Sequence, residues 1–255
     1  MALSELTDVR YEVDNGLAWI VIDRPERLNS FRGRTVVELT DAFQRAWDDP
    51  AVGVVALTGV GERAFCVGHD QKEQEPPLRS REVDAMHRAI REVPKPVIAA
   101  VNGLAVGGGH VLHVLCDLTI AADTARFGQV GPRVGSFDAA DGTAALARVV
   151  GDKRAREIWY LCELYDAATA ERWGLVNKVV PAAGLRAEVR AWADRLLAKS
   201  PTALRNLKHS FNANSASVTG FLPYDALEAY RATEEAREGT LAFAEKREPD
   251  FSRWR

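Results

Sequence analysis

Apolar and polar residues alternate in the first part of the chain. Val9, Tyr11 and Val13 occupy every second position, and the apolar run LAWIVI follows and ends shortly before Pro25. β-branched residues bounded by a breaking proline are typical of strands. The pattern therefore predicts a pair of strands between residues 9 and 25.

Apolar residues then recur at helical spacing in two segments. The first contains Val37, Leu39, Phe43 and Trp47, and the second, after a charged stretch with two prolines, contains Met86, Ile90 and Val93. VGVVALTG, AFCVG and PKPVIAAVNG predict short strands, and LAVGGGHVLHVLCDLTIAAD predicts strand, glycine turn, helix and strand. This alternation continues to about residue 180 and indicates an α/β core.

Helical patterns dominate the end of the chain. We expect helices over Leu185–Ser200, Pro201–Asn212 and Tyr224–Lys246, because strand signals stop near residue 195. We accordingly divide the chain into a core (1–195) and a C-terminal helical region (196–255).

The composition is that of an ordinary globular protein. Of 255 residues, 47% are hydrophobic and 27% charged, and the net charge is −3. This balance disfavours binding to nucleic acid or to an anionic membrane surface. No apolar run reaches the length of a membrane span, about 18 residues, and the N-terminus lacks a signal-peptide pattern. We expect a cytoplasmic protein.

The cysteines and histidines do not form a metal motif. Cys66, Cys116 and Cys162 stand singly in apolar surroundings, as reduced core thiols do. His110 and His113 lie three residues apart on a predicted helix without an evident third ligand, so we expect no zinc. The patterns around His87 and His209 place both on helix surfaces.

Three consecutive glycines, Gly107, Gly108 and Gly109, separate a predicted strand from a predicted helix. Bare N–H groups at a helix N-terminus can receive a negatively charged ligand oxygen. Close packing of helix on sheet is the alternative reason for such glycines. The spacing of a dinucleotide-binding GxGxxG turn is absent.

A second turn follows the predicted strand AFC, in the segment AFCVGHDQK. Gly68 permits a tight turn there. An oxyanion hole needs two N–H donors directed at one developing negative charge. Together with the triple glycine, this turn could supply the second donor.

The motifs in order are RPERLNSFR, AFCVGHDQK, PKPVIAAVNGLAVGGGHVLHVLCDLTIAAD, ARFGQVGPRVGSFD, KRAREIWYLCELYDA, WGLVNKVV and KREPDF. Together they closely resemble the crotonase (enoyl-CoA hydratase/isomerase) superfamily, over residues 10 to 252. They most resemble a subgroup with 2-ketocyclohexanecarboxyl-CoA hydrolase and 1,4-dihydroxy-2-naphthoyl-CoA synthase. The resemblance implies an α/β fold, a spiral of ββα units with a C-terminal helical trimerisation region. It also implies a homotrimer or a dimer of trimers.

The resemblance implies that the N–H groups of His69 and Gly108 form an oxyanion hole. Most relatives carry glycine or alanine in place of His69, whose ring could narrow the pocket, make a polar contact or point to solvent. Val111 and Gly131 occupy the places of the two hydratase glutamates. Neither can transfer a proton, so hydration by the usual route is not expected.

The subgroup implies other catalytic residues. Asp138 matches a catalytic carboxylate, although an aspartate before a helix can also be an N-cap. Thr143 matches an assisting hydroxyl. Gln129 and Gly131 match the place where some relatives hold bicarbonate, and Trp159 matches a wall of the site.

Two positions depart from the subgroup. Relatives have an aromatic residue where this chain has Asp141, and a tyrosine that reaches a neighbouring subunit's site where it has Arg231. Tyr230 could replace that tyrosine, although the adjacent position on a helix points about 100° away. Arg231 could instead pair with a substrate carboxylate.

Coenzyme A is expected as part of the substrate, with no tightly bound cofactor except possible bicarbonate. The resemblance assigns contacts with the nucleotide of coenzyme A to Arg32, Lys72, Phe243 and Lys246. Further candidate substrate-binding residues are Gly68, Asp70, Gln71 and Arg231. Lysine and arginine suit the nucleotide phosphates.

The leading hypothesis is an acyl-CoA enzyme that stabilises a thioester enolate during ring-opening hydrolysis of a cyclic β-ketoacyl-CoA. Ring closure of the naphthoyl-CoA synthase type is the first alternative. The second is an enoyl-CoA hydratase or isomerase with relocated acid–base groups. A non-catalytic member that binds CoA or RNA is the third, and the near-neutral composition disfavours RNA.

Overall fold

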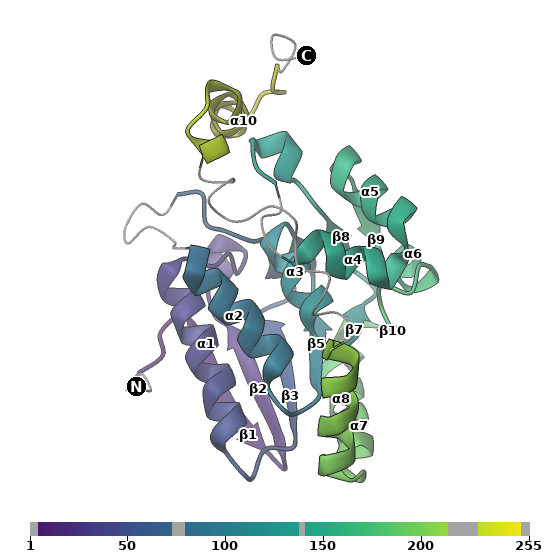
Figure 1. Ribbon diagram of the computed structural model, residues 1–255. Helices are drawn as coiled ribbons and strands as arrows, with labels where there is room; N and C mark the ends of the chain where they lie inside the picture. The colour runs from purple at the N-terminus through teal and green to yellow at the C-terminus, as the bar shows by residue number, and fades with distance from the viewer. Residues whose placement is uncertain (1–4, 73–79, 138–140, 214–228, 251–255) are drawn as a thin grey trace.

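The computed structural model describes residues 5–72, 80–137, 141–213 and 229–250. Within them the strands form two sheets (Figure 1). The larger has the order β1-β2-β3-β5-β7-β10, with β1 antiparallel to β2 and the other pairs parallel. Its strands are β1 (Val9–Asp14), β2 (Leu17–Ile22), β3 (Val54–Gly59), β5 (Val97–Val101), β7 (Leu118–Ala122) and β10 (Lys178–Val180).

The smaller sheet has the order β4-β6-β8-β9, and only the β8–β9 pair is antiparallel. Its strands are β4 (Ala64–Cys66), β6 (Leu104–Val106), β8 (Arg126–Gly128) and β9 (Leu164–Asp166). This sheet positions the site, because the first two strands lead into the turns with Gly68 and Gly107.

The described α-helices are α1 (Gly33–Asp48), α2 (Ser80–Glu92), α3 (Gly108–Leu115), α4 (Gly142–Val150), α5 (Asp152–Leu161), α6 (Ala167–Arg172), α7 (Leu185–Leu197), α8 (Pro201–Ala213) and α10 (Glu234–Glu245). Short 3-10 turns are η1 (Pro25–Arg27), η2 (Gly131–Val134) and η3 (Ala182–Gly184). None of the helices in the described ranges is long and apolar enough to cross a membrane.

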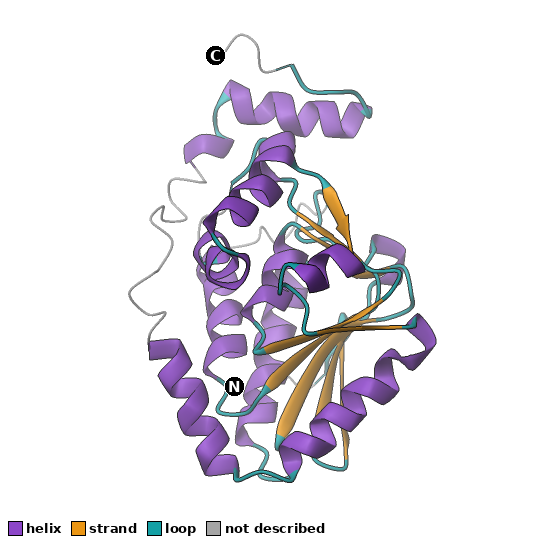
Figure 2. Ribbon diagram, turned by 90° about the vertical axis from the view of Figure 1, so that its right-hand side faces the viewer, coloured by secondary structure: helices purple, strands orange, loops and turns teal. Residues whose placement is uncertain are grey.

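Helices cover both faces of the larger sheet (Figure 2). On β2, Ala18, Ile20 and Ile22 join the cluster that includes α1, α2 and α3, while Leu17 and Trp19 face α7. A strand covered on both faces is apolar throughout rather than alternating, as LAWIVI is. The predicted strand pair at residues 9–25 and the α/β core are confirmed.

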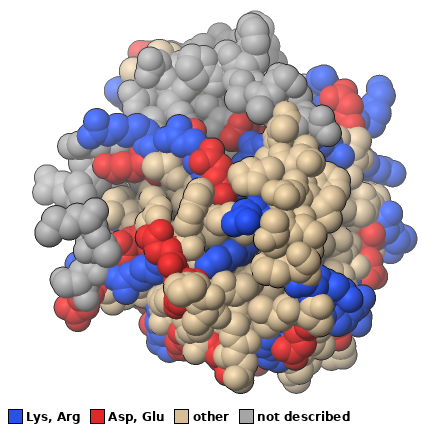
Figure 3. Space-filling view, turned by 60° about the horizontal axis from the view of Figure 1, so that its bottom comes forward, with Lys and Arg blue, Asp and Glu red and all other residues tan. Residues whose placement is uncertain are grey.

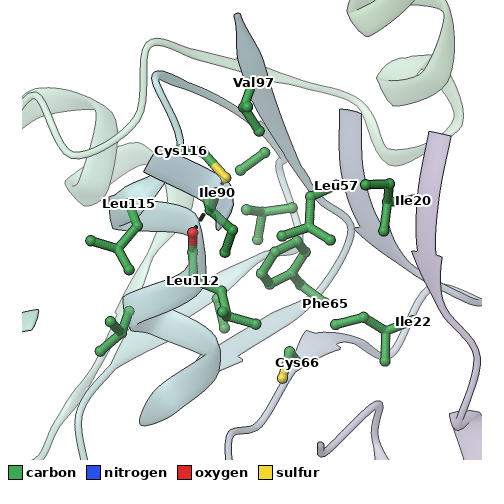
Figure 4. Packing of buried hydrophobic residues seen from close by; sticks show 14 of the residues in the cluster. Ile20, Ile22, Leu57, Phe65, Cys66, Ile90, Val97, Leu112, Leu115 and Cys116 are labelled. Carbon is green, nitrogen blue, oxygen red and sulfur yellow. Dashed lines mark hydrogen bonds between the residues drawn. The ribbon is translucent and has the colours of Figure 1, made fainter. Parts of the chain in front are cut away.

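The main core lies between the larger sheet and α1, α2 and α3 (Figure 4). Phe65 from β4, Ile90 from α2 and Leu112 from α3 are fully buried there. The three cysteines are buried and free, as expected. Burial raises the pKa of the Cys66 thiol to about 12, so this thiol stays protonated.

Two helix predictions need correction. Val37 and Trp47 are 40% and 41% exposed, because the inward stripe of α1 runs through Val36, Leu39 and Phe43. The predicted helix over Tyr224–Lys246 is not continuous where it is described. Thr233 has extended backbone angles and accepts a hydrogen bond from the Ala236 N–H, so a new helix begins there.

The helices predicted over Leu185–Ser200 and Pro201–Asn212 are confirmed as α7 and α8. The domain boundary near residue 195 stays a prediction, and α7, within which it falls, packs on the larger sheet.

Helix α10 lies apart from α7 and α8 and packs on η2 (Figure 1). The contact is close because glycines face each other. A Cβ atom on Gly239 would lie 2.4 Å from the backbone nitrogen of Gly135. The C-terminal helix therefore sits over the η2 segment of its own chain.

Candidate active site

A cavity of about 680 Å³ opens where the two glycine turns meet. Its lining comes from the segment between Glu26 and Phe31, the loop after β4, the first turn of α3 and the β8–η2 segment. Two residues of α2, one of α5 and two of the C-terminal region complete it. Lys72 and Phe243 are exposed, whereas His87, Val111 and Trp159 are buried. The exposed residues mark the mouth of the cavity and the buried ones its inner end.

The two turns are in direct contact. A Cβ atom on Gly68 would lie 2.8 Å from the backbone nitrogen of Gly108. Gly68 and Gly107 have φ values of +84° and +58°, which side chains other than glycine rarely adopt. The three glycines before α3 differ in role, because Gly109 packs on the Cys66 carbonyl, where a Cβ atom could not fit. The packing explanation therefore holds for Gly109, and the anion-site explanation for Gly108 stays a prediction.

The backbone of His69 is oriented by Phe31. The Phe31 N–H donates to the Gly68 carbonyl and the Asp70 N–H donates to the Phe31 carbonyl, both in a parallel bridge. In this pairing the N–H of His69 points away from Phe31. The Gly108 N–H is the first of α3 and has no intrahelical acceptor. No described residue accepts either N–H, and both residues line the cavity.

The His69 ring is half-buried at the cavity, 6.4 Å from the Phe31 ring between centroids. Burial and the positive charge of Arg231 lower its pKa, and Asp70 opposes the shift. The imidazole is thus neutral at pH 7. It narrows the cavity without adding a charge beside the two N–H groups.

A buried network holds the loop that contains His69. Asp70 accepts a hydrogen bond from Arg24 at 2.9 Å, and Arg24 donates to the Ser30 carbonyl. Burial opposes ionisation of Asp70, but the hydrogen bonds from Lys72 and Arg24 and nearby positive charge give it a lowered pKa. The carboxylate of Asp70 therefore positions the loop, although it also borders the cavity.

Several predicted substrate-binding residues meet at the cavity. Its described lining includes Gly68, Asp70, Gln71, Lys72, Trp159, Arg231 and Phe243. Arg32 and Lys246 do not line it. Arg32 forms a two-pronged ion pair with Asp8, at 2.7 and 2.8 Å, and Lys246 ends α10 in a left-handed conformation.

The predicted catalytic residues are only partly brought together. Gln129 and Gly131 line the cavity, and Thr143 is exposed on α4 outside it. Tyr230 also lies outside the lining and packs on Phe137, with 5.6 Å between ring centroids. Asp138 lies outside the described residues.

The side chain of Gln129 has partners within its own chain, and the bicarbonate place at Gln129 and Gly131 stays a prediction. The side-chain nitrogen of Gln129 lies 3.3 Å from the Gly107 carbonyl oxygen, to which it donates, and 3.3 Å from Nδ1 of His110. The amide therefore donates to Gly107, and its role toward His110 depends on the tautomer of the imidazole. No step proposed below uses bicarbonate.

The two positions that match the glutamates of typical hydratases hold residues without a titratable group. Val111 and Gly131 both line the cavity. The acidic residues among the described lining are Glu26, which is exposed at the mouth, and Asp70, which is paired with Arg24. The described lining therefore offers no free buried carboxylate to act on a bound acyl group.

The departures at Asp141 and Arg231 gain a structural explanation. Asp141 lies 3.4 Å from Arg91, so an ion pair with α2 replaces the aromatic residue of relatives. Arg231 lines the cavity of its own chain.

Sequence reasoning missed His87. It is 5% exposed and lines the cavity, and it does not lie on a helix surface as predicted. His87 follows Val83 by four residues and precedes Ile90 by three, so the same apolar spacing that revealed α2 could have placed it on the buried face. His209 is exposed on α8 as expected. No group of metal ligands occurs among the described residues.

Comparison with known proteins bears on the family and the fold. A sequence model of the enoyl-CoA hydratase/isomerase family matches residues 12–253. The chain is similar to the structure of an enoyl-CoA hydratase from Mycobacterium avium subsp. paratuberculosis K-10, with 31% identity and a TM-score of 0.88. That match covers 97% of this chain and 100% of the other.

Another similar structure is an enoyl-CoA hydratase/carnitine racemase from Magnetospirillum magneticum, at 30% identity and a TM-score of 0.77. It covers 97% of this chain and 96% of the other. The mixed α/β fold with parallel sheets and C-terminal helices is the one expected. The chain therefore belongs to the enoyl-CoA hydratase/isomerase (crotonase) superfamily of acyl-CoA enzymes.

Proposed function

We propose that this enzyme binds the carbonyl oxygen of a CoA thioester between the N–H groups of His69 and Gly108 and stabilises the enolate that forms there. The supporting observation is the contact of Gly68 with Gly108, since it opens both turns onto one cavity. Each N–H lacks an acceptor among the described residues. Both are fixed before the ligand arrives.

Such a hole acts through preorganised dipoles. As the α-carbon gains electrons, negative charge collects on the thioester oxygen, and two N–H dipoles and the N-terminus of α3 stabilise it. Loss of one donor of this kind costs about 10²–10³-fold in rate. Because the ring of His69 is neutral, the backbone N–H of this residue, and not its side chain, stabilises the negative charge.

For the reaction we propose ring opening of a cyclic β-ketoacyl-CoA. Water adds to the ring ketone, and the bond from that carbon to the α-carbon then breaks. The electron pair of this bond becomes the thioester enolate, and a proton then adds to the α-carbon. A carboxylic acid remains at the far end of the opened chain.

The apolar places of Val111 and Gly131 support this reaction, because ordinary hydration lacks its acid and base there. We propose Asp138 as the group that activates water, on its sequence match alone. Ring closure would use the same oxyanion hole in the opposite direction.

The test is mass spectrometry of 2-ketocyclohexanecarboxyl-CoA incubated with the wild type and with Asp138→Asn. Pimelyl-CoA should form with the wild type and be much reduced with the variant. Absence of pimelyl-CoA from the wild-type reaction would exclude ring hydrolysis. Equal turnover by both proteins would remove Asp138 from its role.

Hydration or isomerisation through relocated acid–base groups is the second candidate. The names of the similar structures favour it. Crotonyl-CoA hydration at an ordinary enzymatic rate, about 1–10³ per second, would establish this candidate and refute our inference from Val111 and Gly131.

A further inference from the structure

His87 is a buried polar group without a described partner. It lies on α2, is 5% exposed, and neither of its ring nitrogens has a hydrogen bond within the described part of the chain. A neutral imidazole carries one N–H donor and one lone-pair acceptor. Leaving both unmet inside a protein is costly and uncommon.

The other two buried histidines differ from His87. Nδ1 of His113 lies 3.3 Å from the Thr119 hydroxyl, and Nδ1 of His110 lies 3.3 Å from the Gln129 amide. Neither of these histidines lines the cavity, whereas His87 does. His87 is thus placed to contact a ligand.

The charged neighbours of His87 on α2 are engaged elsewhere. Asp84 pairs with Arg88 at 2.7 Å, and Arg91 pairs with Asp141 at 3.4 Å. Burial, with a small contribution from Arg91 and against the effect of Asp84, lowers the pKa of His87 to about 4. The ring is therefore neutral at pH 7 and suits an uncharged oxygen better than a carboxylate.

The position of His87 identifies which part of the ligand it meets. Helix α2 packs on α3, which begins at Gly108, and Val111 one turn further also lines the cavity. Trp159, whose indole N–H is also buried without a described acceptor, lines it too. With the thioester oxygen at Gly108 and the nucleotide toward the exposed mouth, the acyl group extends to this inner end.

We propose that His87 hydrogen-bonds a carbonyl or hydroxyl oxygen on the acyl group, so that the substrates are oxygenated acyl-CoA thioesters rather than plain hydrocarbon ones. The inference rests on the proposed function, since it assumes that the thioester occupies the hole. It makes His87 a specificity-determining residue.

The test is isothermal titration calorimetry with cyclohexanecarboxyl-CoA and its 2-hydroxy analogue. These ligands differ by one oxygen, and both lack the ring ketone to which water adds in the proposed hydrolysis. We expect the wild type to bind the hydroxylated ligand about 10-fold more tightly, the worth of one neutral hydrogen bond. His87→Leu should lose this preference, and His87→Gln should retain part of it. Thermal unfolding checks that each variant is folded.

Equal binding of both ligands by the wild type, or an unchanged preference in His87→Leu, would overturn the role of His87 alone. Failure of the wild type to bind either ligand would overturn the proposed function as well. NMR of ¹⁵N-labelled imidazole in the wild type needs no variant. The His87 nitrogen shifts should respond to the hydroxylated ligand more than to the plain one, and equal responses would contradict the inference.

Discussion

A network of buried ion pairs holds the loop that supplies one of the two donors of the proposed oxyanion hole. Arg24 is 7% exposed and contacts Asp70 at 2.9 Å and Asp8 at 3.7 Å. Asp8 in turn binds Arg32 and Thr35. The position of the His69 N–H therefore depends on this chain of charges as well as on the bridge to Phe31.

Replacement of Arg24 by methionine should destabilise the protein by about 3–5 kcal/mol, because two buried carboxylates lose a partner. The free energy of unfolding in urea measures this. Arg10→Met is the matched control, since Arg10 forms an ion pair with Asp23 on the surface, where about 1 kcal/mol or less is expected. Equal losses of unfolding free energy in Arg24→Met and Arg10→Met would contradict a larger contribution from the buried ion pairs of Arg24.

Buried histidines should make the protein less stable as the pH falls. Burial lowers the pKa of His87 to about 4 and of His110 to about 3, below the ordinary 6.5. The unfolded chain then binds more protons than the folded one once the pH drops below 6.5. The contribution of these neutral histidines to the free energy of unfolding is fully present above that pH. It declines as the pH falls toward the folded-state pKa values.

For His87 the expected loss is about 2 kcal/mol of unfolding free energy between pH values of about 6.5 and 5. His87→Gln should reduce the loss of unfolding free energy over this pH range by about that amount. His209→Gln, on the exposed face of α8, should leave the loss unchanged. Urea unfolding at several pH values provides the measurement. Identical slopes in wild type and His87→Gln would contradict a buried neutral ring.

At the scale of elements, α10 completes the cavity through a glycine contact. Its packing on η2 places Arg231 and Phe243 at the lining. Alanine normally improves a helix by about 1 kcal/mol over glycine. At Gly239, however, the added Cβ would lie 2.4 Å from the Gly135 nitrogen.

Gly239→Ala should therefore weaken the docking of α10, by about 1–3 kcal/mol for overpacking. We expect faster hydrogen exchange in residues 234–245 and a higher KM for the CoA thioester. Thr240→Ala, at the next, exposed position, is the control that should leave both unchanged. An unaltered KM in Gly239→Ala would separate α10 from substrate binding.

Some elements could be predicted from sequence and others could not, for physical reasons. The period-2 pattern gave β1, and glycines next to strands pointed to the two turns. The break before α10 was missed because the capping hydroxyl of Thr233 has no effect on hydrophobic spacing. His87 was missed because a polar residue on an apolar face reveals its role only when its cavity is known.

The pairing of Arg32 with Asp8 and of Asp141 with Arg91 joins residues distant in sequence. No local pattern could have shown that these charges are engaged. The loop residues Gly68 to Lys72, by contrast, were predicted at the site as one motif through the family resemblance, and all of them line the cavity.

Across the whole molecule, surface charges of both signs are interspersed on the face shown in Figure 3. This agrees with the net charge of −3, and the described residues on that face form no basic patch for nucleic acid. Assembly into a trimer stays a prediction. Leu207 and Phe211 on α8, 55% and 73% exposed, are large apolar side chains that a neighbouring subunit could cover.

Analytical ultracentrifugation of the 28.0 kDa chain should therefore give three or six copies. Phe211→Ser should shift the distribution toward the monomer, whereas Phe243→Ser, at the cavity mouth, should change ligand binding and leave the assembly intact. A monomeric wild type would refute the predicted trimer.

The proposed function depends on the oxyanion hole. One of its two donors, the Gly108 N–H, can be removed by one substitution. Proline at the first position of a helix keeps the backbone but has no N–H. A Cβ atom at Gly108 would meet the Phe31 ring at 2.6 Å, so Gly108→Pro and Gly108→Ala are best compared in a Phe31→Leu background. Both add the Cβ atom, and proline also replaces the donor hydrogen with its ring Cδ atom.

The most direct measurement is enolate formation itself, as exchange of the α-protons of an acyl-CoA with D₂O, followed by mass spectrometry. With binding saturated, the exchange rate in Gly108→Pro should be about 10²–10³-fold below that in Gly108→Ala. Equal exchange rates in the two variants would contradict the proposed oxyanion hole.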